Sequence, residues 1–191
     1  MKIGLFFGSF NPVHTGHLII ANFMVEFTNL DKVWFVVSPQ NPLKTQLSLL
    51  NEFDRMEFIR LSIEDNDKLE VSDIEFNMPR PSYTIDTLVY LQEKHPGQEF
   101  VLLMGTDTLM TLPRWKNYEQ LLDNYAIYAY PRPGSQRSEL ESHFKVSVFD
   151  APLMKISASF IRDAIREGKS VQYLVPEPVR KYIDRWGFYR G

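Results

Sequence analysis

The sequence predicts an α/β fold, a doubly wound parallel sheet followed by C-terminal helices. Short apolar runs typical of buried strands alternate with segments of helical period. Polar loops rich in Gly and Pro separate the segments, and after Pro152 the alternation gives way to consecutive helices. A chain of 191 residues suffices for one well-buried core. We therefore expect a single domain over 1–191, of which 151–191 is the helical C-terminal part.

The first half of the chain supplies three expected strands and two helices. The run 3–7 is apolar and closed by Gly8, and apolar residues recur at helical spacing after the Pro12 loop. The segment 51–64 also has a helical period, which is expected to turn Phe53, Met56, Ile59 and Ile63 inward. In chain order the expected elements are a strand at 3–7, a helix over 18–27, a strand at 32–37, a polar loop at 38–50, a helix over 51–64 and a weak strand at 69–71.

The second half repeats the alternation and then ends in helices. Thr84 is a candidate N-cap for a helix that stops before Pro96. A strongly apolar run then ends at Gly105, and Gly168 ends a later helix. The expected elements are a helix over 84–95, a strand at 100–104, a short helix around 118–122, strands at 125–130 and 145–149, and helices near 159–167 and 177–185.

Composition excludes several function classes. With 21 Lys and Arg against 24 Asp and Glu, the formal net charge is -3, which argues against a nucleic-acid partner. The absence of Cys excludes disulfides and thiolate metal sites. No stretch approaches the ~20 apolar residues of a membrane span. The apolar run near the N-terminus is interrupted at Gly8 and is too short for a signal peptide. We expect a soluble cytoplasmic protein with no membrane partner, and leave a homo-oligomer open.

The segment 4–17, GLFFGSFNPVHTGH, predicts a phosphate-binding loop between the first strand and its helix. Such a loop places backbone N–H groups and a positive helix end at the sheet edge where ligands bind. Gly8 and Gly16 allow close approach, and His14 and His17 can donate to phosphate from one side of the helix. In the alternative, the histidines cap the helix or pack in the core. The whole combination favours phosphate binding.

GSFNPVHTGH resembles the G-x-F-x-P-x-H-x-G-H signature of the nucleotidyltransferase superfamily. Enzymes of that superfamily transfer a nucleoside monophosphate from a triphosphate and release pyrophosphate. Their second signature, Ile-Ser-x-Thr-x-x-Arg, is matched by ISASFIR at 156–162, with Ala158 and Ser159 as departures. The resemblance implies a Rossmann-like nucleotidyltransferase fold in which both motifs meet at ATP.

The second motif also has a physical interpretation. Ser157 or Ser159 begins a helix whose N–H groups face phosphate, and which of the two serines contacts phosphate stays open. Arg162 can pair with phosphate in a fixed geometry, whereas Phe160 is assigned to the apolar side of the helix. The alternative is an ordinary amphipathic helix with solvated arginines.

Three segments in the middle of the chain indicate which substrate accepts the adenylyl group. RPSYTIDTL at 80–88, MGTDTLMTLPRWKNYE at 104–119 and YPRPG at 130–134 resemble bacterial nicotinate-nucleotide adenylyltransferases, which join nicotinate mononucleotide to the AMP part of ATP and make deamido-NAD. The resemblance implies that Trp115 stacks on the nicotinate ring and that backbone amides near Thr84 and Lys116 bind its carboxylate. Tyr83 is a further candidate. A core role for either aromatic residue, or a solvated one for Lys116, is the alternative.

The same resemblance assigns the remaining ATP contacts. Gly105 lets a ribose approach, and Asp107 accepts from ribose hydroxyls or supports metal-bound water. The alternative is a helix N-cap at Asp107, which could hold at the same time. Arg132 frames the adenine and phosphates, and Lys44 lies near the triphosphate. The expected ATP-binding set is Gly8, Ser9, Phe10, His17, Gly105, Asp107, Arg132, Ser157, Ser159 and Arg162.

The implied chemistry needs no protein nucleophile, because an ionised phosphate oxygen of the mononucleotide attacks the α-phosphorus of ATP. Catalysis then comes from holding two anions and stabilising charge, a task assigned to His14, His17, Lys44 and Arg162. Mg²⁺ is expected to arrive with ATP, so no protein metal cage is expected. The alternatives are a nicotinamide mononucleotide or phosphopantetheine acceptor, or a nucleotide-binding regulator without turnover.

Overall fold

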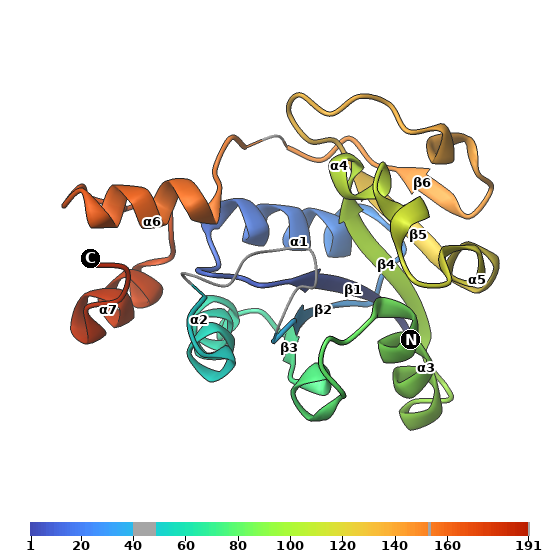
Figure 1. Cartoon of the computed structure of the whole chain (residues 1–191), viewed down its shortest axis with the longest axis horizontal. Coiled ribbons are helices and arrows are strands. Elements are labelled where there is room, and N and C mark those ends of the chain that lie inside the picture. Colours follow the sequence, from blue (N-terminus) through green and yellow to red (C-terminus); the bar gives the residue numbers. More distant parts are fainter. Residues whose placement is uncertain (40–48, 153, 191) are drawn as a thin grey trace.

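The described residues, 1–39, 49–152 and 154–190 of this computed structural model, form one six-stranded parallel sheet (Figure 1). The strand order is β3-β2-β1-β4-β5-β6, so the sheet grows outward in two directions from β1 and β4. This is the doubly wound sheet that the sequence predicts. The strands are β1 (Lys2–Gly8), β2 (Lys32–Val37), β3 (Leu69–Ser72), β4 (Glu99–Gly105), β5 (Ala126–Tyr130) and β6 (Val146–Val148).

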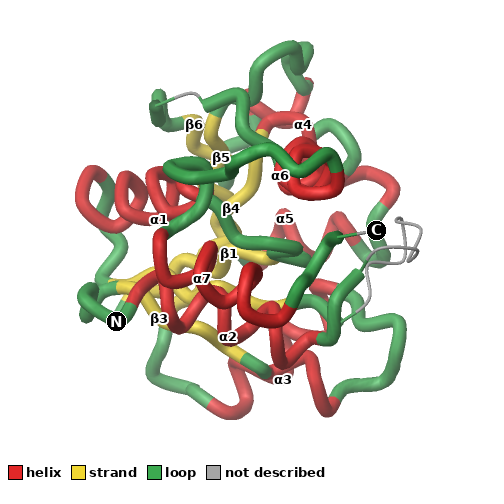
Figure 2. Tube along the Cα trace, turned by 90° about the vertical axis from the view of Figure 1, so that its left-hand side faces the viewer, coloured by secondary structure: helices red, strands yellow, loops and turns green. Residues whose placement is uncertain are grey.

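Helices cover both faces of the sheet (Figure 2). One apolar cluster joins the sheet to α1, α2, α6 and α7, and the other joins it to α3, α4 and α5. The α-helices are α1 (Thr15–Phe27), α2 (Glu52–Ile63), α3 (Thr84–Lys94), α4 (Thr106–Leu109), α5 (Tyr118–Asn124), α6 (Ala158–Arg166) and α7 (Glu177–Trp186). The 3₁₀ turns are η1 (Ile74–Asn77), η2 (Leu112–Arg114) and η3 (Glu139–Ser142). No helix among the described residues is long and apolar enough to cross a membrane.

The two central strands place the site. β1 pairs with β4 in parallel, Phe6 opposite Leu103, so the chain segments after Gly8 and Gly105 leave the same edge of the sheet. The strand order reverses between these two strands, and ligands of doubly wound sheets bind at such a reversal. The loop after β1 and the start of α4 therefore border the expected crevice.

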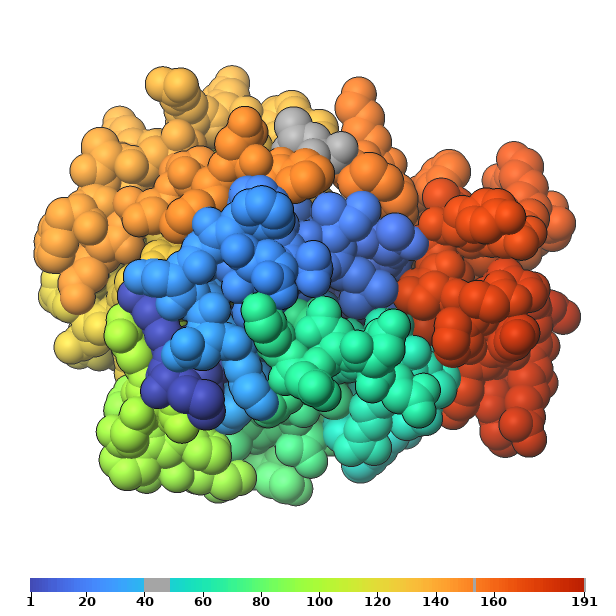
Figure 3. Space-filling view, turned by 180° about the vertical axis from the view of Figure 1, so that it is seen from behind, coloured from blue at the N-terminus to red at the C-terminus, as the bar shows by residue number. Residues whose placement is uncertain are grey.

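The C-terminal helices pack onto this edge rather than standing apart. In Figure 3 they lie against α1 and α2. The Tyr182 hydroxyl in α7 donates to Asp54 of α2 at 3.2 Å, and the Thr15 N–H at the start of α1 donates to the Leu174 carbonyl at 2.9 Å. The C-terminal part of the chain is thereby held against α2 and against the start of α1.

Three local predictions are wrong. Phe53 does not point inward: its side chain is exposed and meets Phe76 of η1 edge-on, while Arg55 is buried instead. Thr84 is the first residue of α3 and Tyr83 occupies the N-cap position. Phe160, assigned to the apolar side of α6, is 55% exposed, because the buried side of that helix is formed by Ile161 and Ala164.

Candidate active site

Two stacked imidazoles open α1. His14 is the N-cap residue, with extended backbone, and His17 lies one turn later. The His14 N–H donates to Nδ1 of His17 at 3.2 Å, and the ring centroids lie 3.6 Å apart. Because Nδ1 of His17 accepts, the neutral ring carries its proton on Nε2. The expectation that both rings lie on one side of the helix is confirmed.

Neighbouring residues hold this pair in place. His17 meets the rings of Phe10 and Phe6 edge-on, at centroid distances of 5.2 and 5.9 Å. A Cβ on Gly16 would lie 3.1 Å from Nδ1 of His14, tighter than most real contacts. A Cβ on Gly8 would lie 2.7 Å from the Phe10 ring. Both glycines thus make room for the loop's own aromatic rings, a reason that the sequence did not reveal.

His14 is held neutral. Its side chain is only 4% exposed, and its Nδ1 has no hydrogen-bond partner within the described part of the chain. Burial and, next, the positive charge of Arg132 lower the pKa of His14 to about 4. An anion bound beside the ring would favour the protonated form and oppose both causes.

The opposite wall of the site comes from β4, α4 and the loop after β5. The Arg132 N–H donates to Oγ1 of Thr106 at 3.1 Å, and Nε of Arg132 lies 3.6 Å from Oδ2 of Asp107. A Cβ on Gly105 would lie 2.4 Å from Asp107 and 2.6 Å from Arg132, so a larger residue there would have to displace these two side chains. The N-cap of α4 is Gly105 and not Asp107, which leaves the carboxylate on the exposed first turn.

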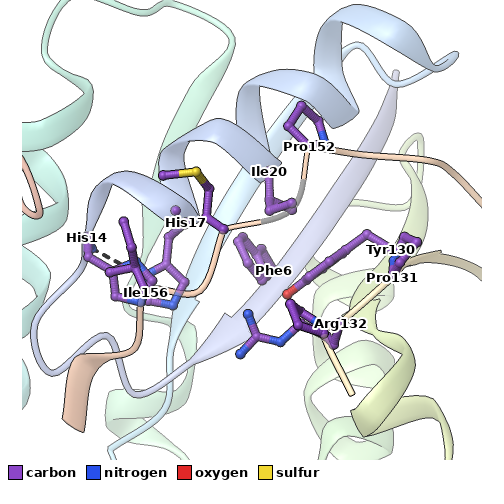
Figure 4. Close-up of a pocket in the computed structure, with 12 residues that line it drawn as sticks. Phe6, His14, His17, Ile20, Tyr130, Pro131, Arg132, Pro152 and Ile156 are labelled. Carbon is purple, nitrogen blue, oxygen red and sulfur yellow. Dashed lines mark hydrogen bonds between the residues drawn. The ribbon is translucent and has the colours of Figure 1, made fainter. Parts of the chain in front are cut away.

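A pocket joins the imidazoles to this wall (Figure 4). The Arg132 guanidinium extends into the space beside Phe6, toward the two histidines. Apolar side chains line the pocket together with the nitrogen-bearing side chains of His14, His17 and Arg132, a mixture typical of small-molecule sites. The lining residues are Phe6, His14, Gly16, His17, Ile20, Tyr130, Pro131, Arg132, Pro133, Pro152, Met154 and Ile156.

The second motif reaches the first through Arg162. Its Nη1 donates to the carbonyl of Asn11 at 2.8 Å, and its Nη2 donates to Oγ of Ser159 at 3.2 Å. Ser157 is the N-cap of α6, since its Oγ accepts from the Phe160 N–H. The question which serine begins the helix is thus answered. The two serines have different partners, and both are exposed at the helix start.

The segments assigned to the acceptor lie side by side. Nζ of Lys116 binds Asp86 at 2.8 Å and lies 4.8 Å from the centre of the Tyr83 ring. Thr84 is the first residue of α3, and Asp86 lies in the first turn of that helix. The N-terminal end of α3 therefore lies beside Lys116. Trp115 is half-buried, and its Nε1 has no hydrogen-bond partner among the described atoms.

The structure brings most of the expected residues to one edge of the sheet. His14, His17 and Arg132 line one pocket, and Arg162 is bonded to the loop that leads into it. Lys44 lies outside the described residues. Ser9 and Phe10 belong to the same loop, where Phe10 is buried with a positive φ of 44°.

Sequence reasoning missed the apolar part of the pocket. Tyr130 ends β5, whereas Pro152 and Ile156 both lie in the connection between β6 and α6. Tyr130 reads as the last residue of a buried strand, and burial does raise its pKa to about 12. The YPRPG stretch, which contains Tyr130, and the ISASFIR motif, which begins at Ile156, were the usable signals for this wall, whereas nothing pointed to Pro152.

Comparison with known proteins decides the family. The model of the cytidylyltransferase-like family matches residues 5–164. A probable nicotinate-nucleotide adenylyltransferase of Flavobacterium johnsoniae is 52% identical over 192 residues, covering 100% of both chains. The one from Cytophaga hutchinsonii is 54% identical and covers 96% of this chain and 95% of that protein. This chain belongs to the nicotinate-nucleotide adenylyltransferase family.

Membership of the nicotinate-nucleotide adenylyltransferase family makes the chain a nucleotidyltransferase and confirms the resemblance seen in its motifs. The fold is confirmed separately. Plasmodium falciparum nicotinic acid mononucleotide adenylyltransferase complexed with NaAD superimposes with a TM-score of 0.85 at 20% identity, covering 98% of this chain and 97% of that one. The same enzyme complexed with APC gives a TM-score of 0.82.

Proposed function

We propose that this protein transfers the adenylyl group of ATP to nicotinate mononucleotide, giving deamido-NAD and pyrophosphate in NAD biosynthesis. The observation that carries the proposal is the stacked pair of His14 and His17, which shares a pocket with Arg132 and a loop with the Arg162 contact. Family membership supports the same reaction. We take 1–191 as one domain, because the helical part 151–191 supplies Arg162.

The reaction needs groups that hold charge. An oxygen of the mononucleotide's 5′-phosphate attacks the α-phosphorus of ATP, a new P–O bond forms, and the bond to the β-phosphate breaks as pyrophosphate leaves with the electron pair. The Nε2 proton of His17 and the His14 ring would donate to the α-phosphate region, and Arg162, with Lys44, would neutralise the β- and γ-phosphates. Such preorganised donors stabilise charge that develops in the transition state.

On the acceptor side, the pyridine ring would stack on Trp115. A flat electron-poor ring favours an aromatic face, and backbone N–H groups near Thr84 and Lys116 favour a carboxylate over a carboxamide. The contacts of the Lys116 side chain with Asp86 and Tyr83 support this arrangement, because they join the two segments. In this role Lys116 acts through its backbone, and its side chain ties the two segments together.

Mg²⁺ fits this site as an ion carried by ATP. No group of three or more His, Asp or Glu that could hold a metal occurs in the described ranges, and Asp107 offers a single exposed carboxylate beside Arg132. Mg²⁺ binds through one or two carboxylates plus phosphate oxygens and water. When bound, it neutralises charge on the triphosphate. Asp107 would hold it through water, while Arg132 stays on the adenine side.

The deciding experiment measures pyrophosphate release from ATP by the purified chain, with nicotinate and nicotinamide mononucleotide in parallel. We expect release with the nicotinate substrate, a product with the mass of deamido-NAD, and a much smaller kcat/KM with the amide. A preference for the amide, or turnover only with phosphopantetheine, would replace the proposed acceptor. ATP binding without turnover on any acceptor would leave a regulator.

A further inference from the structure

Two charged side chains outside the pocket are almost completely buried. Arg55 of α2 is 0% exposed and Glu75 of η1 is 2% exposed. Neither forms an ion pair with a residue in the described ranges. A buried charge costs several kcal/mol unless hydrogen bonds satisfy it. Their hydrogen-bond partners therefore indicate what the fold gains from them.

Arg55 is satisfied by backbone carbonyls from separate segments. Its Nη1 donates to Ser9 at 2.6 Å and to Ser38 at 2.9 Å, and its Nε donates to Leu50 at 2.9 Å. A fourth bond runs from Nη2 to Pro39 at 3.3 Å. Ser9 belongs to the histidine-bearing loop after β1. The planar guanidinium thus fixes that loop to the end of β2 and to the start of α2.

Glu75 is satisfied by hydroxyl groups at the start of α3. One carboxylate oxygen accepts from Ser82 at 2.9 Å and the other from Thr87 at 2.8 Å. The Ser38 side chain also lowers the pKa of this carboxyl, which partly offsets the effect of burial. Ser82 directly precedes Tyr83 and Thr84, so Glu75 holds the segment that the proposed function assigns to the acceptor.

Ser38 connects the two charged groups. Its carbonyl accepts from Arg55, and its N–H donates to the carbonyl of Gly8 at 3.0 Å. Its side chain is near enough to Glu75 to lower the pKa of that carboxyl. Arg55 and Glu75 thus both act on Ser38, and we call these three residues the brace. One end of the brace grips the loop after β1 and the other grips the start of α3.

We propose that the brace is a positioning device that sets the triphosphate loop and the acceptor segment at a fixed separation. Arg55 acts on ATP through Ser9, and Glu75 acts on the mononucleotide through Ser82. Because both side chains are buried, neither is a catalytic residue. The inference rests on the proposed function, and it adds that each end of the brace controls one substrate.

The test separates the two KM values. Arg55→Met keeps the volume and removes the carbonyl bonds, so it should raise KM for ATP about tenfold and leave KM for nicotinate mononucleotide within about twofold. Glu75→Gln should raise KM for nicotinate mononucleotide about tenfold and leave KM for ATP within about twofold. Arg55→Lys, which keeps charge and part of the bonding, should recover part of the ATP effect. Ile63→Ala, which empties a buried apolar position of the same helix, should lower Tm and leave both KM values unchanged.

The proposal is overturned if Arg55→Met and Glu75→Gln raise both KM values equally, or lower Tm with no change in either. Should Arg55→Met fail to fold, Arg55→Lys and Ser38→Ala decide the question. Ser38→Ala removes the hydroxyl and keeps the carbonyl that binds Arg55, so only KM for nicotinate mononucleotide should rise. The wild-type rate distinguishes the two hypotheses. A wild type that releases no pyrophosphate refutes the proposed function. An active wild type whose variants change both KM values alike refutes the brace alone.

Discussion

The guanidinium of Arg162 donates to the backbone carbonyl of Asn11 at 2.8 Å, across 151 positions of sequence. This bond brings the late arginine to the loop that carries the histidine pair. The Tyr189 hydroxyl donates to the side-chain oxygen of the same Asn11 at 2.7 Å. The nucleotide loop is thus held by the α6 helix and by the C-terminal segment together.

Replacing Arg162 tests this arrangement. A lysine has one terminal nitrogen where arginine has two, so in Arg162→Lys the side chain cannot bind the Asn11 carbonyl and a phosphate at the same time. We expect kcat/KM for ATP to fall by about 100-fold. Initial rates of pyrophosphate release measure it. Arg166→Lys is the matched control, because Arg166 pairs with Asp163 on an exposed face, and its rate should stay within about twofold. Equal losses in both variants would contradict the assignment.

His14→Ala removes the donor that the proposed function assigns to the α-phosphate region. We expect kcat to fall by about 100-fold or more, the scale of losing one preorganised donor. Steady-state rates at saturating ATP measure this, and the control is His143→Ala, a half-buried histidine at the end of η3. Near-normal turnover of His14→Ala would show that the ring only packs the helix start.

The lowered pKa of His14 predicts a pH-dependent stability. The group protonates at about 4 when folded and at about 6.5 when unfolded, so the unfolded chain binds more protons between those values. Its contribution to the free energy of unfolding is complete above about pH 6.5 and is lost as pH falls toward 4. The loss should reach about 3 kcal/mol.

Urea unfolding at pH 7 and at pH 4.5, with wild type and His14→Asn side by side, measures this contribution. Other groups titrate over the same range and contribute equally to both proteins. The free energy of unfolding that each protein loses between pH 7 and pH 4.5 is therefore compared, and the difference reports His14. The wild type should lose more stability than the variant. Parallel pH profiles would mean that the ring is no less readily protonated in the folded protein.

Trp115 tests the acceptor site. Trp115→Ala should raise KM for nicotinate mononucleotide about tenfold, and KM for ATP far less, because a base–aromatic stack is worth about 1–3 kcal/mol. Trp115→Phe keeps a ring and should recover most of the effect. Rates at varied concentrations of each substrate provide the measurement. Equal changes in both KM values would assign Trp115 to packing.

Much of the architecture follows from local sequence. The apolar runs at 3–7 and 100–104 fall within β1 and β4, because parallel strands buried on both faces have no polar positions. Helix ends were less predictable. Ser157 caps α6 as a serine should, but Tyr83 stands where α3 would favour a small polar cap.

The brace was beyond sequence reasoning. Arg55 and Glu75 are charged residues in polar-looking segments, which usually face solvent. Their partners are backbone carbonyls and hydroxyls of segments that meet only in the folded sheet. The histidine loop was accessible because its chemistry is concentrated in a few neighbouring positions, whereas the apolar pocket wall is assembled from Tyr130, Pro152 and Ile156.

The bond between Tyr189 and Asn11 spans 178 positions, so the loop that carries the histidines is held by a residue that is synthesised long after it. A chain interrupted during translation before residue 189 carries the histidines without this support. We expect such a fragment to hold the histidine-bearing loop less firmly and to bind ATP less tightly than the chain that contains Tyr189.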